Sequence, residues 1–351
     1  MLLTNAEMDL LRLCGWCKDL PAYSQYLDCS DFKALLLTGL LFNSRNGQSV
    51  RLTNEGRNLL ETVGYVYEKD NTVRSVGSRL TKRLETSELM LFLFQGKTDV
   101  FCSSVPDRNS PLSFLPAFAL RREKNKNPLG TARFNGMLYT KNTATALYYI
   151  SDRNDGLYPE TERNTFSMNI LTGGRKSAAA FTGVGELGEL LSFAQRKTTN
   201  SKALPYFDAV RRLDCPVSFF PLSANGARQM RIMSVKEHRR IIAQNILKKK
   251  YTPPEHRWYD AGGKILVGID LDFPRMETAA EYGVHIFLLD WQVDASKEIL
   301  RGKKAVLHPI KTGEAEELLR LSPELHTKET KPYVTKEGEL LSAPIKMDCE
   351  A

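Results

Sequence analysis

Residues 38–57 read TGLLFNSRNGQSVRLTNEGR, and this stretch decides the fold of the first part of the chain. Asn46-Gly47 is a strong hairpin signal, and it lies between the apolar runs 41–42 and 50–52. Thr53 is a good N-cap for the helix that follows. The stretch therefore predicts two paired strands, joined by a tight turn and followed by a helix.

The residues before this stretch predict three short helices. The first covers residues 5–19 and ends before Pro21, the second covers 22–28, and the third begins at Ser30 or Asp31 and carries an apolar stripe. Three helices, a hairpin and a closing helix are the order of a winged helix-turn-helix. Modules of this type can place one helix in the DNA major groove.

The net charge of +8 is distributed unevenly along the 351 residues. Residues 1–70 carry a net charge of −2, residues 71–150 carry +7, residues 151–250 carry +8, and residues 251–351 carry −5. A basic centre favours a polyanionic partner, because neutralising phosphates releases counterions. A solvated surface is the alternative explanation of the same charge.

The predicted recognition helix contains a single cation, Lys33, so a winged helix that docks onto protein stays an alternative to one that contacts DNA. Around the predicted wing, three arginines are better candidates for phosphate contact. The nominated nucleic-acid-binding residues are Lys33, Arg45, Arg51, Arg57, Arg79, Lys82, Arg83, Arg239, Arg240, Lys248, Lys249 and Lys250.

The remainder of the chain predicts a mixed α/β (α+β) architecture. Residues 78–94 predict a helix, and residues 106–127 a loop rich in Pro, Asn and charge. Strands are expected at 137–139, 146–150, 217–222, 265–270 and 284–289, and helices at 184–197, 235–250 and 276–282, whereas 166–171 fits either. The predicted divisions are 1–70, a winged helix; 71–127, a connector and loop; 128–320, an α/β domain; and 321–351, a polar, disordered tail.

Metal-dependent cleavage of DNA would need clustered carboxylates. Asp270, Asp272 and Asp290 follow two predicted strands and are the candidates, although strand ends often carry Asp for structural reasons. Tyr148-Tyr149 could supply a relaxase nucleophile, but the five histidines are scattered without metal-ligand spacing. Residues 173–177 fall short of a P-loop. A divalent metal is therefore expected only if the chain is a nuclease, and no other cofactor is indicated.

Several phrases resemble the replication-relaxation proteins of plasmids and integrative elements, chiefly from Gram-positive bacteria. The phrases are residues 38–41, 52–57, 133–138 and 147–150, with acidic Glu160 and Glu162 after them. The resemblance implies a DNA-binding protein of plasmid replication or DNA relaxation, whose second domain is similar to restriction-endonuclease-like folds. An active core of that kind should carry Glu-x-Lys on a strand, and the chain has none after Asp152 in a strand context.

The apolar runs and the cysteines bear on the cellular compartment of the chain. We find neither a run of about 18 apolar residues nor a signal peptide, which predicts a cytoplasmic protein that does not enter membranes. The motif Cys14-Gly15-Trp16-Cys17 lies within a predicted helix, so buried structural thiols are expected rather than a redox site.

Three functions follow from these observations, in order of preference. The first is a non-catalytic DNA-binding accessory of a mobile element, which would contact double-stranded DNA and the replication or transfer proteins of that element. The second is a metal-dependent nicking enzyme, a relaxase or nuclease. The third is a protein-docking transcriptional regulator. Homodimerisation stays open.

Overall fold

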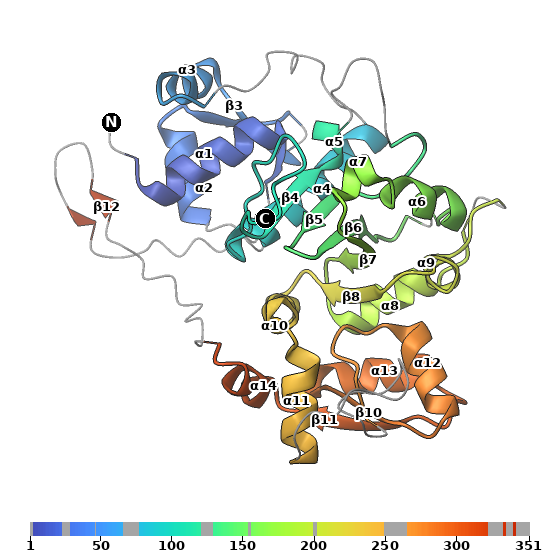
Figure 1. The fold of residues 1–351 in the computed structure, drawn as a ribbon. Coiled ribbons are helices and arrows are strands. Elements are labelled where there is room, and N and C mark those ends of the chain that lie inside the picture. Colours follow the sequence, from blue (N-terminus) through green and yellow to red (C-terminus); the bar gives the residue numbers. More distant parts are fainter. Residues whose placement is uncertain are drawn as a thin grey trace. The chain divides into compact units, whose positions relative to one another are not determined.

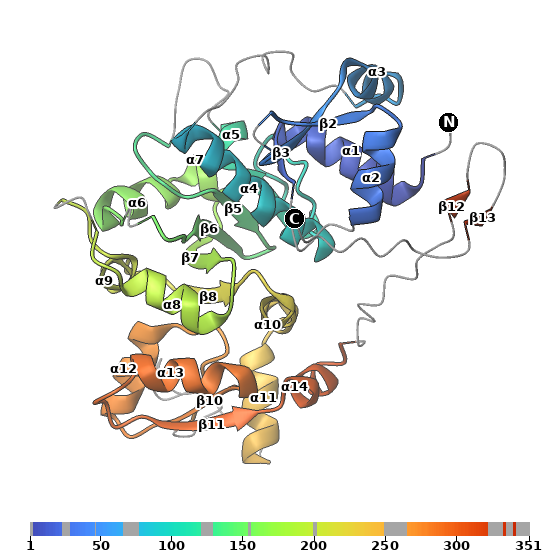
Figure 2. The same ribbon diagram turned by 180° about the vertical axis from the view of Figure 1, so that it is seen from behind.

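The computed structural model describes residues 3–22, 29–45, 47–65, 77–120, 129–153, 156–198, 202–248, 265–321, 333–334 and 340–341. The chain is a mixed α/β protein that divides into two compact units (Figures 1 and 2). The first unit comprises Met1–Gln95 with Glu324–Ala351, and the second comprises Gly96–Pro323. The division falls at Gly96, upstream of the predicted start of the α/β domain at residue 128. No helix within the described ranges combines the length and apolarity that crossing a bilayer requires.

The first unit begins with α1 (Asn5–Cys17), which is fixed at its start by a capping box. The Thr4 hydroxyl accepts from the Glu7 backbone N–H at 3.1 Å, and the Glu7 carboxylate accepts from the Thr4 N–H at 2.7 Å. One face of α1 is buried, with Leu11 fully covered. The predicted first helix is therefore present, and it ends two residues earlier than the sequence suggested.

A three-stranded antiparallel sheet packs against α1. Its strands are β1 (Leu20–Pro21), β2 (Leu41–Asn43) and β3 (Ser49–Leu52), in the order β1-β3-β2. Leu41 pairs with Leu52, so the hairpin that Asn46-Gly47 predicts is present, although Asn46 itself lies outside the described residues. The short strand β1 was not predicted, because two residues carry no alternation.

Among the described residues that precede Gly96, the first unit contains three more helices. They are α2 (Cys29–Leu37), α3 (Asn54–Thr62) and α4 (Ser78–Gln95). Thr53 caps α3 as expected, because its hydroxyl accepts from the Gly56 N–H at 3.1 Å. Residues 23–28 of the helix predicted at 22–28 lie outside the residues that the structure describes. The predicted tail also lies mostly outside them, except that β12 (Tyr333–Val334) and β13 (Leu340–Leu341) pair in antiparallel fashion, which corrects the expectation of a tail without structure.

The second unit is built on a five-stranded mixed sheet in the order β4-β5-β6-β7-β8. The strands β4 (Ser113–Pro116), β5 (Gly136–Tyr139) and β6 (Thr143–Tyr149) are antiparallel, whereas β7 (Lys176–Gly183) and β8 (Val217–Pro221) run parallel to β6. The loop predicted over 106–127 is wrong at 113–120. Those residues form the fully buried β4 and then α5 (Ala117–Leu120).

Aromatic side chains join the strands of this sheet. Tyr148, Phe181 and Phe219 occupy neighbouring positions on β6, β7 and β8, and their ring centroids are 4.9 and 5.1 Å apart. The connecting helices are α6 (Pro159–Phe166), α7 (Asn169–Thr172), α8 (Leu187–Gln195) and α9 (Tyr206–Val210). Tyr206 of α9 contacts Phe181 edge-on at 6.1 Å, so α9 covers this aromatic face.

A second sheet in the same unit consists of β9 (Ile265–Val267), β10 (His285–Leu289) and β11 (Val306–Ile310), all parallel. Its helices are α10 (Ala224–Ser234), α11 (His238–Leu247), α12 (Phe273–Glu281), α13 (Val293–Ile299) and α14 (Thr312–Leu318), with a 3₁₀ turn, η2 (Asp290–Gln292). Residues of α10, α11 and α14 form one apolar cluster with the three strands. The predicted strand–helix–strand unit is thus present, and β11 extends it.

The two sheets of the second unit meet at β8 and β9. The Phe219 N–H donates to the Asp270 carbonyl at 3.0 Å, and the buried amide of Gln229 donates to the carbonyls of Phe219 and Ile269 at 2.8 and 2.7 Å. Phe273 of α12 continues the aromatic contacts from Phe219 at 5.6 Å. These bonds satisfy backbone groups of the outer strand β8 that would otherwise be open to pairing with another chain.

Candidate nucleic-acid interface

Two of the nominated arginines bind a buried carboxylate within the first unit. Asp19 is only 1% exposed, and both Arg51 and Arg83 form ion pairs with it, the latter at 3.0 Å. The Ser49 hydroxyl donates to the same carboxylate at 2.9 Å. Asp19 therefore connects β3 to α4, and these two arginines have a structural role. Sequence reasoning did not single out Asp19, because its partners lie 30 to 64 residues away.

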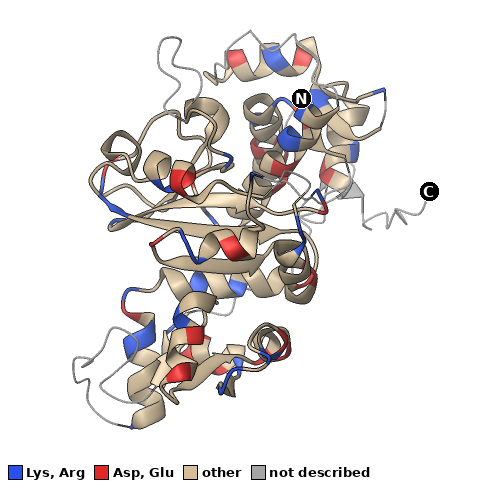
Figure 3. Cartoon of the chain, turned by 90° about the vertical axis from the view of Figure 1, so that its right-hand side faces the viewer, with Lys and Arg blue, Asp and Glu red and all other residues tan. Residues whose placement is uncertain are grey.

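Four other nominated cations of the first unit are exposed. Arg45 lies in the turn between β2 and β3, Arg57 on α3, and Arg79 and Lys82 in the first turns of α4. None of the four forms an ion pair with another residue that the structure describes. Lys33 lies half-buried on α2. Figure 3 shows Lys and Arg of the chain in blue, interspersed with acidic residues in red.

Large apolar side chains are also exposed in the first unit. Leu37 at the end of α2 is 77% exposed, and Phe42 of β2 is 44% exposed. Single exposed apolar residues are common in soluble proteins. Here they lie on the helix and strand that a winged helix would present to a partner, so they bear on the choice between DNA and protein.

Two of the five nominated cations of the second unit lie on α11, and Lys248 directly follows it. Arg239 forms an ion pair with Asp270, and Arg240 forms one with Glu237 one turn away. Lys248 is exposed directly after α11, where a cation is stabilised by the helix dipole. Lys249 and Lys250 lie outside the described residues. Arg239 is therefore held at the junction of the sheets rather than presented as an isolated cation.

The three candidate catalytic carboxylates each have a structural partner. Asp272 accepts from the Val217 N–H at 3.3 Å and from the Arg275 N–H at 3.2 Å, so it supports β8 and caps α12 together. Asp270 binds Arg239. Asp290 accepts from the Thr312 hydroxyl at 2.7 Å.

Asp270 nevertheless influences Asp272. Burial and the neighbouring Asp270 raise the pKa of Asp272 to about 6. Within the described part of the chain, no three His, Cys, Asp or Glu side chains gather as metal ligands. The arrangement therefore stabilises a junction between two sheets, and it offers no ligand set for a catalytic metal among these residues.

Neither tyrosine of the pair at 148–149 is exposed. The Tyr148 hydroxyl donates to the buried Glu162 carboxylate at 2.9 Å, and burial together with Glu162 raises the pKa of Tyr148 well above its usual value. A tyrosine nucleophile must reach its phosphate and lose its proton, and Tyr148 is placed for neither.

The phrases that suggested a family resemblance have clear structural roles. Glu162 also accepts from the Arg133 N–H at 2.9 Å, and the Asn135 side chain accepts from the Tyr149 N–H at 2.8 Å. These bonds fix the entry to β5 and join β6 to α6. Comparison with family models, with curated proteins and with solved structures gives no match to this chain. Evidence about function therefore comes from the arrangement of its charged and polar side chains.

Residues 173–177 do not form a phosphate-binding loop. Gly173 ends α7 with a positive φ of 57°, and the buried Arg175 donates to the carbonyls of Pro106 and Thr140 at 2.8 and 2.9 Å. Cys14 and Cys17 are buried, and burial raises the pKa of Cys17 to about 12. Both observations fit structural roles for these motifs.

Proposed function

We propose that this chain is a DNA-binding accessory protein, in which residues 3–65 form a winged-helix module that contacts duplex DNA. The observation that carries the proposal is the turn between β2 and β3. It joins an antiparallel hairpin beside a helical layer, and it presents the exposed Arg45 without an ion-pair partner among the described residues. A cation at the tip of a wing is free to contact phosphates.

Several other features support this function. Arg57 adds a second exposed cation close in sequence to the hairpin, and Arg51 is held by Asp19 in the strand between them. The sequence resemblance implies work for a mobile element, in plasmid replication, relaxation or transfer. It also implies a restriction-endonuclease-like second domain, and the mixed sheet β4–β8 is compatible with that fold.

The accessory role is favoured over catalysis. The paired strands β5 and β6 contain no acidic residue, whereas a nuclease of the implied fold needs carboxylates there. The three carboxylates proposed for metal binding have other partners. Asp270 binds Arg239, Asp272 accepts from backbone N–H groups, and Asp290 accepts from the Thr312 hydroxyl.

The test is binding of the full chain to short duplex DNA across a salt series, with and without Mg²⁺. We expect tight binding at low salt, a steep loss as salt rises, and intact DNA in both conditions. The double variant Arg45→Ala/Arg57→Ala should lower the slope of log K against log salt by about 2, because each lost phosphate contact removes about one released counterion. Arg301→Ala is the matched control, since Arg301 is 83% exposed in the second unit.

A failure of the intact protein to bind duplex DNA would overturn the proposal, and an unchanged salt slope in the double variant would remove the wing from it. A second candidate function, docking onto protein, is favoured by the exposed Leu37 and Phe42. It expects little DNA affinity at physiological salt. Nicking that requires Mg²⁺ and disappears in Asp270→Ala would instead restore the enzyme alternative.

A further inference from the structure

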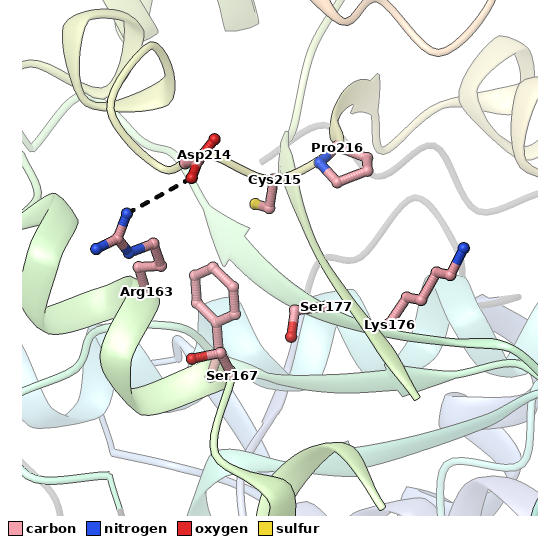
Figure 4. A pocket seen from close by; sticks show the side chains of 8 residues that line it. Arg163, Ser167, Lys176, Ser177, Asp214, Cys215 and Pro216 are labelled. Atoms are coloured by element: carbon pink, nitrogen blue, oxygen red, sulfur yellow. Dashed lines mark ion pairs between the residues drawn. The ribbon is translucent and has the colours of Figure 1, made fainter. Parts of the chain in front are cut away.

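The cavity of the second unit does not gather its charged groups at one point. It has a volume of about 410 Å³ and lies between α6, β7 and the residues that lead into β8 (Figure 4). Arg163 pairs with Asp214 at one side, with 3.8 Å between Nη1 and Oδ2, whereas Lys176 lies at the opposite side and its ammonium group points outward. A closer polar contact lies elsewhere in this unit, between two histidines of the second sheet.

His285 and His308 lie side by side on neighbouring strands. His285 begins β10 and is exposed, and His308 is the third residue of β11 and is half-buried. The parallel register places His308 beside Phe287, two residues after His285, so both histidines point to the same face of the sheet. The His285 Nδ1 lies 2.7 Å from the His308 Nε2, which is a hydrogen-bond distance. Because 23 residues separate the two histidines in the sequence, no spacing motif indicates the pair.

The two imidazole rings meet edge to edge. Their planes differ by 15°, and their centroids are 4.9 Å apart although the facing nitrogens are only 2.7 Å apart. Rings stacked face to face would bring their centroids about as close as their atoms, so these rings lie nearly in one plane, which suits an N–H···N hydrogen bond. A zinc ion bound tetrahedrally by both nitrogens would hold them about 3.3 Å apart, since each Zn–N bond is about 2.0 Å. The observed contact is therefore closer than a shared metal ion requires.

Neither ring forms an ion pair with a carboxylate that the structure describes. On its other side, the His308 ring contacts Phe287 with 4.7 Å between centroids, and Phe287 packs against the apolar cluster of this sheet. The charged side chains of the neighbouring elements are Lys248 after α11, Glu281 of α12, Lys303 and Lys304 before β11, and Glu317 and Arg320 at the end of α14. Of these, Lys303 and Glu281 pair with each other at 3.6 Å. Two charges on the pair would therefore have no counterion among the described residues.

The number of protons on the pair decides whether its hydrogen bond exists. With no added proton, or with one, one ring donates an N–H to the free nitrogen of the other. With two added protons, both facing nitrogens carry hydrogen, so no acceptor remains and two positive charges lie at contact distance. Burial lowers the pKa of His308 from its ordinary value of 6.5, and the neighbouring His285 lowers it further. The folded chain therefore resists the second proton.

We propose that His285 and His308 form a proton-operated clasp, which joins β11 to β10 while the pair carries at most one added proton and opens when both rings are charged. In its three-stranded sheet β11 is an outer strand, and β10 is its partner there. Opening also withdraws His308 from Phe287 and so loosens the margin of the apolar cluster. The stability that the clasp contributes is complete above about pH 6.5 and is lost as pH falls through the lowered pKa of His308. The clasp lies in the second unit and does not depend on the DNA contacts proposed for the first.

The first test follows the histidines of the full chain by NMR, after labelling with ¹³C at the imidazole Cε1. The chain has five histidines, so the variants His285→Gln and His308→Gln assign the signals of the pair. We expect His308 to titrate below pH 6.5 in the unaltered chain, and its pKa to rise toward 6.5 in His285→Gln, because glutamine carries no charge. An unchanged titration of His308 in that variant would overturn the proposal.

Amide hydrogen exchange measures whether the strand opens. Protection factors of the β11 amides that pair with β10 should fall about tenfold between pH 7.5 and pH 5 in the unaltered chain, because a hydrogen bond is replaced by repulsion. In His285→Gln the fall should stay within about twofold, since the glutamine amide can still accept or donate and cannot be charged. His238→Gln is the matched control and should keep the full response, because His238 lies at the start of α11 and contacts the Val235 carbonyl. Equal protection at both pH values in the unaltered chain, or a full response in His285→Gln, would overturn the clasp.

Discussion

Asp272 lies where the two sheets of the second unit meet, and its carboxylate serves two elements at once. It accepts from Val217 on β8 and caps α12 through Arg275. Burial beside Asp270 raises its pKa from 3.8 to about 6. The folded chain therefore holds this proton over a pH range in which the unfolded chain has released it. This contribution to stability is present below about pH 4 and is lost as pH rises through 6.

The variant Asp272→Asn should remove this component of the pH dependence. Its amide imitates the protonated carboxyl, so the variant loses less stability than the unaltered chain between pH 4.5 and 7, by roughly 2 kcal/mol. Urea unfolding at the two pH values measures the difference. Asp294→Asn, at a side chain that is 95% exposed, is the control and should leave the dependence unchanged. Parallel curves for Asp272→Asn and the unaltered chain would contradict the assigned pKa.

At the scale of elements, the sequence predicted helices and strands well where a hydrogen bond between neighbouring residues determines the structure. Thr53 caps α3, and the hairpin around Asn46-Gly47 is present, because caps and tight turns depend on a few neighbouring residues. The strand β7 was missed, although it is paired on both sides within its sheet. Its run Ala178-Ala179-Ala180 has weak strand preference, and pairing with β6 and β8 overrides that preference.

The same contrast between local and long-range determinants applies to the candidate sites. Sequence reasoning placed Asp270 and Asp272 together at the end of a strand, but it could not find Arg239, which holds Asp270 from 31 residues away. The ion pair between Arg163 and Asp214 was missed for the same reason, because the two residues come from separate segments with no spacing motif and only the packing of α6 beside the start of β8 brings them together.

Two glycines in helices provide a test of how closely elements pack. A Cβ on Gly226, in the first turn of α10, would lie 1.8 Å from the Pro221 carbonyl oxygen, whereas a Cβ on Gly188 of α8 would meet nothing within 4 Å. Gly226→Ala should destabilise the chain by about 2 kcal/mol or more, because backbone must move. Gly188→Ala should stabilise it by up to about 1 kcal/mol, because alanine favours helix. Thermal and urea unfolding of both variants measure the contrast, and equal effects would contradict the close approach of α10 to β8.

At the scale of the whole molecule, the positive charge is concentrated outside the segment that carries the proposed DNA contacts. Residues 1–70, which contain Arg45 and Arg57, carry a net charge of −2, whereas residues 71–150 and 151–250 carry +7 and +8. If the two arginines carry the duplex contacts, the charge of the central region need not serve duplex binding.

Two double variants separate these contributions. Arg45→Ala/Arg57→Ala should lower duplex affinity, because it removes the proposed phosphate contacts, whereas Lys197→Gln/Arg212→Gln, which removes two exposed cations of the second unit, should leave that affinity nearly unchanged. Titration of both variants with the same duplex at one salt concentration supplies the comparison. An equal loss in the two variants would mean that the central charge contributes to duplex binding as much as the hairpin and α3 do.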